Sequence, residues 1–367
     1  MNVMGKESTK TIKAVAIVLM ILHHFWAFGD NWISGSQIIS IESLSGFPFE
    51  KLVGAFGKIC VGLFAFVTGY AFFAQKKKYQ SNKIRLEKIV RFLLYYWIIY
   101  LIELLLGLLA KEPLPPIGVV LQNLFGFSSK VFEYGTGYVS SCFAWYVYFY
   151  ILLMVTYPII TKEFGNSFWR SLLIPMIIAV GANMALEKLQ NLPVISPLLN
   201  DYFEYMPVVV VGYNIARFNI IGKLTANFKQ KYNALLLYVT AGILFCVCFI
   251  LKVKIAKVFG INIDVICAPI LIYVIESIRI GFLERKKCKT GVVERIVGTL
   301  AKESTNIWFL HAIFFTPYRS YQFLALWPRA SFLIIIWVLI LLIGASKIIS
   351  FFQNLVWYNL TELIKAI

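Results

Sequence analysis

Two adjacent histidines, His23 and His24, are the residues of this sequence best placed to do chemistry, because they lie in the apolar segment 12–28. Ionisable side chains inside such a segment are costly and commonly functional. Burial there favours the neutral imidazole, which can accept a proton as a general base. The alternative is a histidine that only hydrogen-bonds to a neighbouring helix. Successive helical residues point about 100° apart, so at most one of the pair faces a given groove.

Lys13 precedes His24 by eleven residues, which is close to three helical turns and roughly 16 Å of helix. The two side chains therefore share a helix face, together with Ile17, Met20 and Phe28. This face predicts a groove with a cation at its mouth and an imidazole deeper inside. Such a groove suits a long anionic cofactor, whose phosphates would rest at the mouth while its reactive end reaches the histidine.

A dense basic run follows the second apolar segment, where Glu87 is the lone acid among Lys76, Lys77, Lys78, Lys83, Arg85, Lys88 and Arg91. Such a run is most often a topology signal or a contact with anionic lipid. On a helix, Arg85, Lys88 and Arg91 are spaced by threes and broadly share a face, where they could hold phosphates.

The sequence offers little support for metal or nucleotide chemistry of a familiar kind. Its six cysteines show no disulfide or zinc spacing, and we find no HExxH, Walker or dinucleotide glycine motif. We therefore expect no metal and no tightly bound cofactor. The net charge of +17 needs no nucleic-acid partner, because the positive-inside rule explains it.

The elements that must position these residues are membrane-spanning helices. The chain is 60% hydrophobic and 14% charged, with a mean hydropathy of +0.76, which excludes a water-soluble fold. Stretches long enough to cross a bilayer recur throughout and predict an all-α, polytopic bundle of about ten spans. They fall at Ile12–Phe28, Leu52–Ala74, Phe92–Leu109, Phe143–Ile160, Ser171–Leu186, Tyr202–Ala216, Ala234–Leu251, Ile263–Ile280, Thr305–Tyr318 and Ser331–Ser350.

Most of the 35 lysines and arginines fall on the cytoplasmic side if the N-terminus is inside, which predicts that both termini are cytoplasmic. We expect one transmembrane domain, residues 1–350, and a cytoplasmic amphipathic tail, residues 351–367. The apolar run Ile117–Phe127 is too short to span and is expected to be external or re-entrant. The oligomeric state stays open.

Five stretches in a fixed order resemble the acyltransferase 3 family of membrane O-acyltransferases, and the resemblance covers nearly the whole chain. In the first, KTIKAVAIVLMILHHF, ten residues separate Lys13 from His24, where the family has an arginine, ten residues and a histidine. Lysine keeps the positive charge of that arginine but lacks the planar guanidinium, which can donate two parallel hydrogen bonds to one phosphate. The others are GKICVGLFAFVTGYAFF with Thr68, Gly69 and Tyr70, KIRLEKIVRFLLYYW, AWYVYFYILLMVTYPI with Trp145 and Tyr146, and KESTNIWFLHAIFF with Ser304, Asn306 and His311.

The resemblance implies transfer of an acyl group, usually acetyl, from cytoplasmic acyl-CoA to a hydroxyl of a cell-surface or lipid-linked polysaccharide. It implies that His24, with His23 beside it, is the general base, and that the enzyme lies in a bacterial plasma membrane. The residues expected to hold the CoA phosphates are Lys13, Arg85, Lys88 and Arg91. Those assigned to the acceptor or the oxyanion are Trp145, Tyr146, Ser304, Asn306 and His311. Structural packing is the stronger alternative for His311, and Trp145 and Tyr146 are expected to be packing or acceptor-binding groups rather than catalysts.

A proton-coupled transporter or flippase of a lipid-linked sugar is the main alternative, with His23 and His24 as a proton relay. Lys58 and Glu103 also lie within predicted spans and would be its further candidates. We find no internal repeat, which weakens this interpretation. A membrane scaffold without turnover is a third possibility.

Overall fold

The computed structural model describes residues 4–28, 38–111, 113–127, 145–188, 195–224, 234–258, 261–285, 291–314 and 319–366. These residues are helical almost throughout, which confirms the all-α class, and a short antiparallel hairpin of β1 (Lys257–Val258) and β2 (Ile261–Asn262) follows α14. The helices are α1 (Lys6–Trp26), α2 (Ile41–Ser45), α3 (Phe49–Gly57), α4 (Ile59–Ala74), α5 (Lys76–Tyr79), α6 (Asn82–Leu109), α7 (Ile117–Asn123), α9 (Trp145–Val155), α10 (Tyr157–Ile160), α11 (Phe168–Lys188), α12 (Ile195–Arg217), α14 (Ala234–Lys254), α15 (Asp264–Arg285), α16 (Gly291–Leu310), α17 (Arg319–Leu326) and α18 (Ser331–Ala366), with a 3-10 turn, η2 (His311–Phe314), directly after α16.

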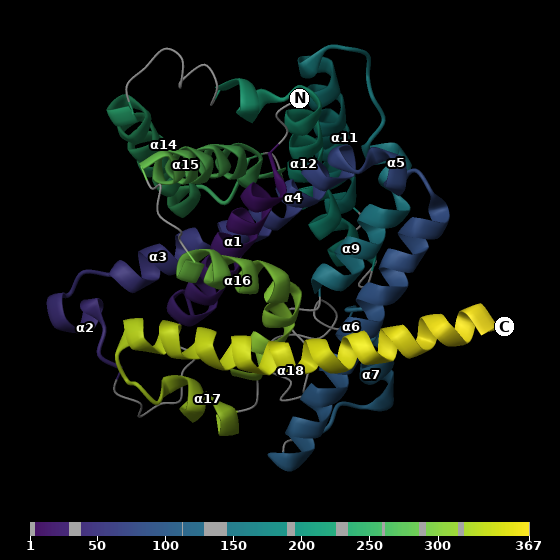
Figure 1. Cartoon of the computed structure of the whole chain (residues 1–367), viewed down its shortest axis with the longest axis vertical. Coiled ribbons are helices and arrows are strands. Elements are labelled where there is room, and N and C mark those ends of the chain that lie inside the picture. Colours follow the sequence, from purple (N-terminus) through teal and green to yellow (C-terminus); the bar gives the residue numbers. More distant parts are fainter. Residues whose placement is uncertain are drawn as a thin grey trace.

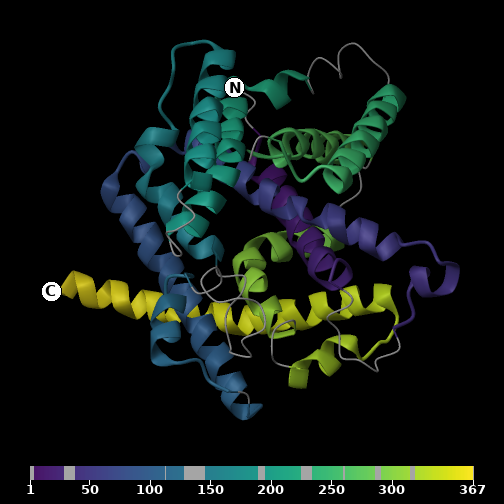
Figure 2. The same cartoon turned by 180° about the vertical axis from the view of Figure 1, so that it is seen from behind.

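Helix α1 runs through the middle of the bundle and packs against α3, α4 and α16 (Figure 1). Around it, α4 packs on α12, α14 on α15, and α16 on α18. Figure 2 shows the same arrangement from behind, with α6 and α9 on the side away from α14 and α15. The central position of α1 means that its side chains meet several helices that are distant in sequence.

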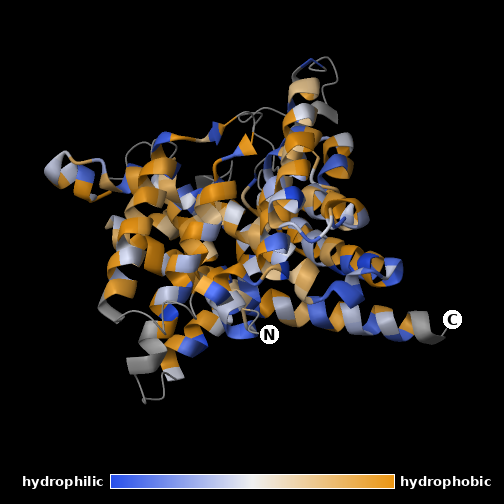
Figure 3. Cartoon of the chain, turned by 90° about the horizontal axis from the view of Figure 1, so that it is seen from above, coloured by the Kyte–Doolittle hydropathy of each residue, from blue (hydrophilic) through white to orange (hydrophobic). Residues whose placement is uncertain are grey.

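Five helices within the described residues are long and apolar enough to cross a membrane: Phe49–Ala74, Asn82–Leu109, Phe168–Leu186, Leu236–Lys254 and Ser331–Leu363. Apolar residues cover most of the helix bodies, and hydrophilic residues gather on the side where α1 begins and where α18 ends (Figure 3). The chain therefore has the helices of an integral membrane protein. The count of ten spans and the orientation of the termini stay predictions, and Phe143 and Tyr318, which bound two predicted spans, lie outside the described residues.

Two predicted features can be compared directly with the helices, the apolar run from Ile117 and the domain boundary at position 350. The apolar run from Ile117 contains the short helix α7, which ends at Asn123. Helix α18 has 36 residues, about 54 Å, and continues without a break across position 350, where the sequence predicted a domain boundary. Since a bilayer core is about 30 Å thick, α18 is long enough to reach well beyond it.

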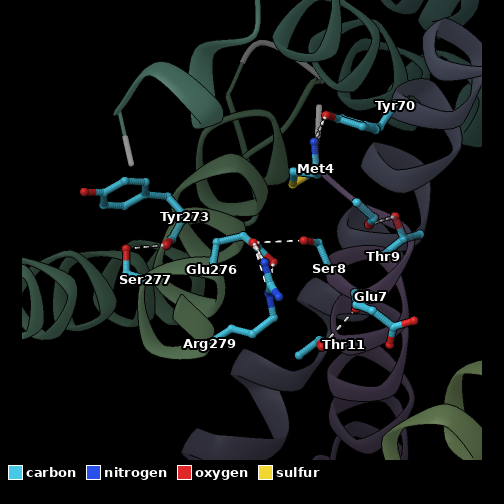
Figure 4. A network of polar contacts seen from close by, with 11 residues as sticks. Met4, Glu7, Ser8, Thr9, Thr11, Tyr70, Tyr273, Glu276, Ser277 and Arg279 are labelled. Atoms are coloured by element: carbon cyan, nitrogen blue, oxygen red, sulfur yellow. Dashed lines mark hydrogen bonds and ion pairs between the residues drawn. The ribbon is translucent and has the colours of Figure 1, made fainter. Parts of the chain in front are cut away.

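Polar contacts fix the start of α1 (Figure 4). The backbone N–H of Met4 donates to the hydroxyl of Tyr70 on α4 over 2.6 Å, and Ser8 donates to Glu276 on α15 over 3.0 Å. Glu276 also accepts from the Arg279 guanidinium over 2.9 Å. These bonds set the depth of α1 relative to α4 and α15, and hence the depth of the residues further along it.

Glycines allow α1 and α4 to approach their neighbours closely. A Cβ at Gly57 of α3 would lie 2.5 Å from the carbonyl oxygen of Leu19 and 3.0 Å from the nitrogen of His23. A Cβ at Gly69 of α4 would lie 1.8 Å from the carbonyl oxygen of Val209 on α12. Small residues at helix contacts of this kind are a common device of membrane bundles.

A group of polar residues lies around the β-hairpin, and we call it the paired-charge cluster: Glu204, Lys252, Asn262 and Asp264, which are buried, and Lys257, which is exposed. Lys252 and Asp264 lie 2.5 Å apart with side chains 3% and 0% exposed, and Lys257 lies 2.6 Å from Glu204. The amide of Asn262 donates to Glu204 over 2.8 Å, and its oxygen accepts from Lys252 over 3.3 Å. The cluster ties α12, α14 and the start of α15 together.

Candidate functional site

Three histidine rings meet where α1 crosses the end of α16, and we call them the histidine cluster: His23, His24 and His311. The ring centroids of His24 and His311 are 4.7 Å apart, and those of His23 and His24 are 4.9 Å apart. The sequence placed His311 in the candidate site without relating it to His24, from which it is separated by 287 positions in the numbering. The fold brings the two together because α1 packs along α16.

Backbone carbonyls set the tautomers of two of these rings. Nδ1 of His23 lies 2.8 Å from the carbonyl oxygen of Gly54, and Nδ1 of His311 contacts the carbonyl oxygen of Trp308. A carbonyl oxygen only accepts, so in the neutral ring each Nδ1 carries the proton and each Nε2 carries the lone pair. These bonds also hold the ring orientations.

Aromatic side chains connect the histidine cluster with α4 and α9. The Trp308 ring lies 6.5 Å from His311, 5.4 Å from Tyr146 and 5.6 Å from Phe64, measured between centroids. Trp145 lies 5.7 Å from Tyr146. The predicted residues Trp145 and Tyr146 therefore belong to one aromatic wall that reaches the histidines through Trp308.

A cavity of about 340 Å³, which we call the basic cavity, opens between α6, α16 and α18. Three cations and one carboxylate line it, Lys88, Arg91, Lys302 and Glu87. Its other lining residues are Ile84, Phe92, Tyr95, Tyr150, Thr305, Asn306, Ser350 and Gln353. The excess of positive charge makes this cavity suited to an anion.

A narrow slot of about 40 Å³ adjoins the basic cavity, because Phe92 and Thr305 line both. The slot is otherwise lined by Phe64, Tyr146, Ser304, Trp308 and Phe309. It is apolar apart from hydroxyl groups, and Trp308 stands between it and His311. The two cavities thus lie next to each other, and Trp308 of the slot has its ring 6.5 Å from that of His311. The groove predicted along the α1 face of Lys13, Ile17, Met20 and His24 is a different arrangement, because none of these residues lines either cavity.

The predicted phosphate ligands differ in their surroundings. Arg91 donates to the Tyr95 hydroxyl over 2.9 Å and lies 5.6 Å from the centroid of the Trp357 ring, while Lys88 lies 5.1 Å from that of Tyr79. Both line the basic cavity. Lys13 lines neither cavity, so its assignment to the donor phosphates stays a prediction.

Arg85 is placed differently from Lys88 and Arg91, although the three share a periodicity. It is 8% exposed, and its guanidinium donates to the carbonyl oxygens of Tyr79 and Gln80 over 2.6 and 3.4 Å and to Asn82 over 2.5 Å. Arg85 therefore closes the turn between α5 and α6 and does not line the basic cavity. Its assignment to the donor stays a prediction, with these contacts against it.

The two polar residues predicted on α16 have separate settings. Ser304 is 4% exposed, donates to the carbonyl oxygen of Ala301 over 3.0 Å and lines the slot. Asn306 and Gln353 exchange hydrogen bonds of 2.8 and 3.0 Å, and Asn306 also donates to Ser350 over 2.9 Å. Asn306 therefore fixes α16 to α18 at the wall of the basic cavity.

Sequence reasoning missed the contribution of α18 and of one lysine on α16. Lys302, Tyr95, Ser350 and Gln353 all line the basic cavity, and Trp357 lies over Arg91. Gln353 and Trp357 fall in the segment that the sequence assigned to a surface tail. The available signal was a polar residue just after the apolar stretch Ser331–Ser350. The structure buries this residue, since Gln353 is 0% exposed.

A further cavity of about 200 Å³ lies at the end of α1 beyond the histidines. Phe25, Trp26, Glu42, Lys51 and Ser331 are among its lining residues. Within the part of the chain that the structure describes, no group of three His, Cys, Asp or Glu side chains is arranged to hold a metal ion.

A comparison with protein families matches residues 9–351 to the family described as "Acyltransferase domain". Comparisons with curated proteins and with solved structures found no match. The matched segment contains all three histidines, every lining residue of the slot, and every lining residue of the basic cavity except Gln353.

Proposed function

The chain belongs to the acyltransferase 3 family, and from that premise we propose that this membrane acyltransferase moves an acyl group, in the simplest case acetyl, from acyl-CoA to a hydroxyl of a cell-surface or lipid-linked polysaccharide. The observation that carries the proposal is that a basic cavity and an apolar slot lie next to each other, with Trp308 of the slot 6.5 Å from His311 of the histidine cluster. Acyl-CoA has the matching shape, with phosphates at one end and a thin thioester arm at the other. The compartment we propose is the bacterial plasma membrane.

The donor enters at the basic cavity in this proposal. Lys88 and Arg91, which line this cavity, meet its phosphates, and Lys13 is a further cation that we propose for the donor. The thioester arm lies in the slot, where Phe64, Phe92 and Trp308 exclude water. The positive-inside rule predicts that this basic mouth is on the cytoplasmic side, where acyl-CoA is found.

His24 is the general base in the proposed reaction. Its imidazole takes the proton of the acceptor hydroxyl while the hydroxyl oxygen attacks the thioester carbonyl carbon. The carbon–sulfur bond then breaks, the thiolate of CoA takes the proton back, and the acyl ester and free CoA are released. His311 keeps the His24 ring in place from 4.7 Å away, and the Tyr146 hydroxyl is the candidate donor to the developing oxyanion.

The acceptor would approach from the other end of α1. The cavity there combines the indole of Trp26 with Glu42, Lys51 and Ser331, and an aromatic face beside hydrogen-bonding groups suits a sugar. Its distance from the basic cavity would keep the two substrates on opposite sides of the histidine cluster.

The test uses the full chain in liposomes with labelled acetyl-CoA, comparing the native protein with His24→Ala for donor hydrolysis and for label transfer to envelope extracts. Consumption of the donor that depends on His24 is the expected result. Full activity in His24→Ala, with the protein present in the membrane at native level, would remove the proposed base. Proton-coupled flux without donor consumption would favour the transporter instead.

A further inference from the structure

Lys302 of α16 is a basic residue at the donor cavity that neither its sequence context nor the predicted phosphate ligands single out. Lys302, Thr305 and Asn306 follow one another at helical spacing, and all three line the basic cavity. The cations on the facing wall, Lys88 and Arg91, come from α6. Positive charges thus converge on the cavity from two helices that are more than 200 residues apart in sequence.

The side chain of Lys302 extends into solvent at the cavity and is not held by a close ion pair with its neighbour Glu303. Lys302 is 77% exposed, and its Nζ lies 4.0 Å from Oε1 of Glu303, beyond hydrogen-bonding distance. Glu303 is 3% exposed and turns towards α18, where its Oε2 accepts from Ser346 over 3.0 Å and from Ser350 over 2.5 Å. Its carboxylate therefore fastens two helices and leaves the lysine directed at the cavity.

The wall that carries Lys302 is rigid in the way a binding site requires. The paired amides of Asn306 and Gln353 lock α16 to α18, and the Gln353 amide also donates to the carbonyl oxygen of Tyr95 on α6 over 3.0 Å. Asn306 and Gln353 are 4% and 0% exposed. A lysine on such a wall, opposite two further cations, has the setting of an anion ligand, whereas an isolated surface lysine only contributes to topology.

We propose that Lys302 binds a phosphate group of the acyl-CoA donor, so that donor binding bridges α6 and α16. This inference rests on the proposed function. The inference extends the proposed function because it assigns phosphate recognition to α16. This helix also carries the slot residue Ser304 and is followed directly by His311. Binding of the phosphates would then fix the position of α16, and with it the distance between the donor arm and the histidine cluster.

The experiment measures equilibrium binding of CoA, dephospho-CoA and pantetheine to the full chain in zwitterionic liposomes, for the native protein, Lys302→Ala and the control Lys347→Ala. Lys347 is exposed on α18 and lines none of the three cavities. We expect Lys302→Ala to weaken CoA binding about tenfold, the size of one charge-assisted contact, and to leave pantetheine, which has no phosphate, at native affinity. An equal loss for dephospho-CoA assigns the contact to the diphosphate, and a loss for CoA alone assigns it to the 3′-phosphate.

Several outcomes would overturn the inference. One is an equal loss of CoA affinity in Lys302→Ala and Lys347→Ala, which would make the effect one of general charge. Another is a loss for pantetheine as large as for CoA, which would make Lys302 structural. Native CoA affinity in Lys302→Ala, with weaker binding of anionic lipid when it is added to the liposomes, would assign the lysine to a lipid headgroup. If the native chain binds CoA and Lys302→Ala binds it equally well, this inference fails alone; if the native chain neither binds CoA nor consumes acetyl-CoA, the proposed function fails with it.

Discussion

The basic cavity and the paired-charge cluster are both rich in charge, but they arrange it in opposite ways. In the cluster, Lys252 and Asp264 are buried and 2.5 Å apart, and Lys257 lies 2.6 Å from Glu204. In the cavity, Lys88, Arg91 and Lys302 line an open space with Glu87 as the acid among them. The cluster is balanced within the protein, whereas the cavity has a surplus of positive charge that a ligand can complement.

The difference separates charges that hold the fold from charges that bind. A buried ion pair tolerates the loss of one partner badly, because the remaining charge is left in a low-dielectric environment. A charge at an open cavity can be removed at little cost in stability, since water replaces the lost contact. Substitutions should therefore affect stability at the cluster and ligand affinity at the cavity, and the predictions below test that division.

The largest effect is expected for Asp264→Ala. It leaves the Lys252 ammonium buried beside Asn262 without its carboxylate, and removing one member of a buried pair costs about 3–5 kcal/mol. The measurement is the free energy of unfolding in micelles, followed by circular dichroism. The double variant Lys252→Met/Asp264→Leu should recover most of the loss, because it removes both charges. A single variant of native stability would show that the pair is not what holds α14 to α15.

The next effect distinguishes two arginines of α6. Arg85→Ala removes a buried guanidinium that donates to the carbonyl oxygens of Tyr79 and Gln80, and we expect it to lower the free energy of unfolding by about 2 kcal/mol. Arg91→Ala should leave stability near native and weaken CoA binding about tenfold. Unfolding and equilibrium binding are measured on both variants. The reverse pattern, with Arg85→Ala weakening CoA and Arg91→Ala unfolding the protein, would contradict the division.

The contrast between Arg85 and Arg91 also shows how far the sequence could reach. Spacing by threes correctly placed Arg85, Lys88 and Arg91 on one helix, and apolar stretches correctly indicated a helical membrane protein. Spacing could not show that Arg85 turns back to Tyr79, because that bond depends on the turn between α5 and α6. A helical face is shared over a turn or two, but the neighbours of each side chain are set by tertiary contacts.

The histidine cluster and the cavity wall show the same limit for distant residues. His24 was a candidate from its apolar setting and from the residues ahead of it. Its neighbour His311 follows only from the packing of α1 on α16. Asn306 and Gln353 were equally beyond reach as a pair, since no local periodicity relates residues on two different helices.

A smaller effect is expected for Trp357→Ala, which sharpens the role of α18. Trp357 lies 5.6 Å from the Arg91 guanidinium, which also meets Tyr95. A cation–π contact at an exposed position contributes about 0.5–1 kcal/mol, so CoA binding should weaken by about twofold to fivefold through a less well positioned Arg91. Trp357→Phe should retain most of the affinity. Since the proposed effect acts through Arg91, Trp357→Ala should add nothing in an Arg91→Ala background, and a full additional loss there would contradict it.

The smallest effect is expected for Glu163, which lies in neither the paired-charge cluster nor the basic cavity. Its side chain is ion-paired but partly exposed. Its carboxylate lies 2.6 Å from Lys76 and 3.3 Å from Arg217, and it accepts a hydrogen bond from Tyr213 over 2.9 Å. The hydrogen bond from Lys76 is the main reason that the pKa of Glu163 is lowered from its ordinary value of 4.5. A carboxyl group with a lowered pKa stabilises the fold above its ordinary value and loses that contribution as the pH falls through the folded value. With a side chain that is 31% exposed, Glu163 should contribute only about 0.5 kcal/mol. The native protein and Glu163→Gln should therefore differ slightly in unfolding free energy at neutral pH and converge as the pH falls below 4.5. A gap that stays constant on acidification would show that the hydrogen bonds, and not the charge, make the difference.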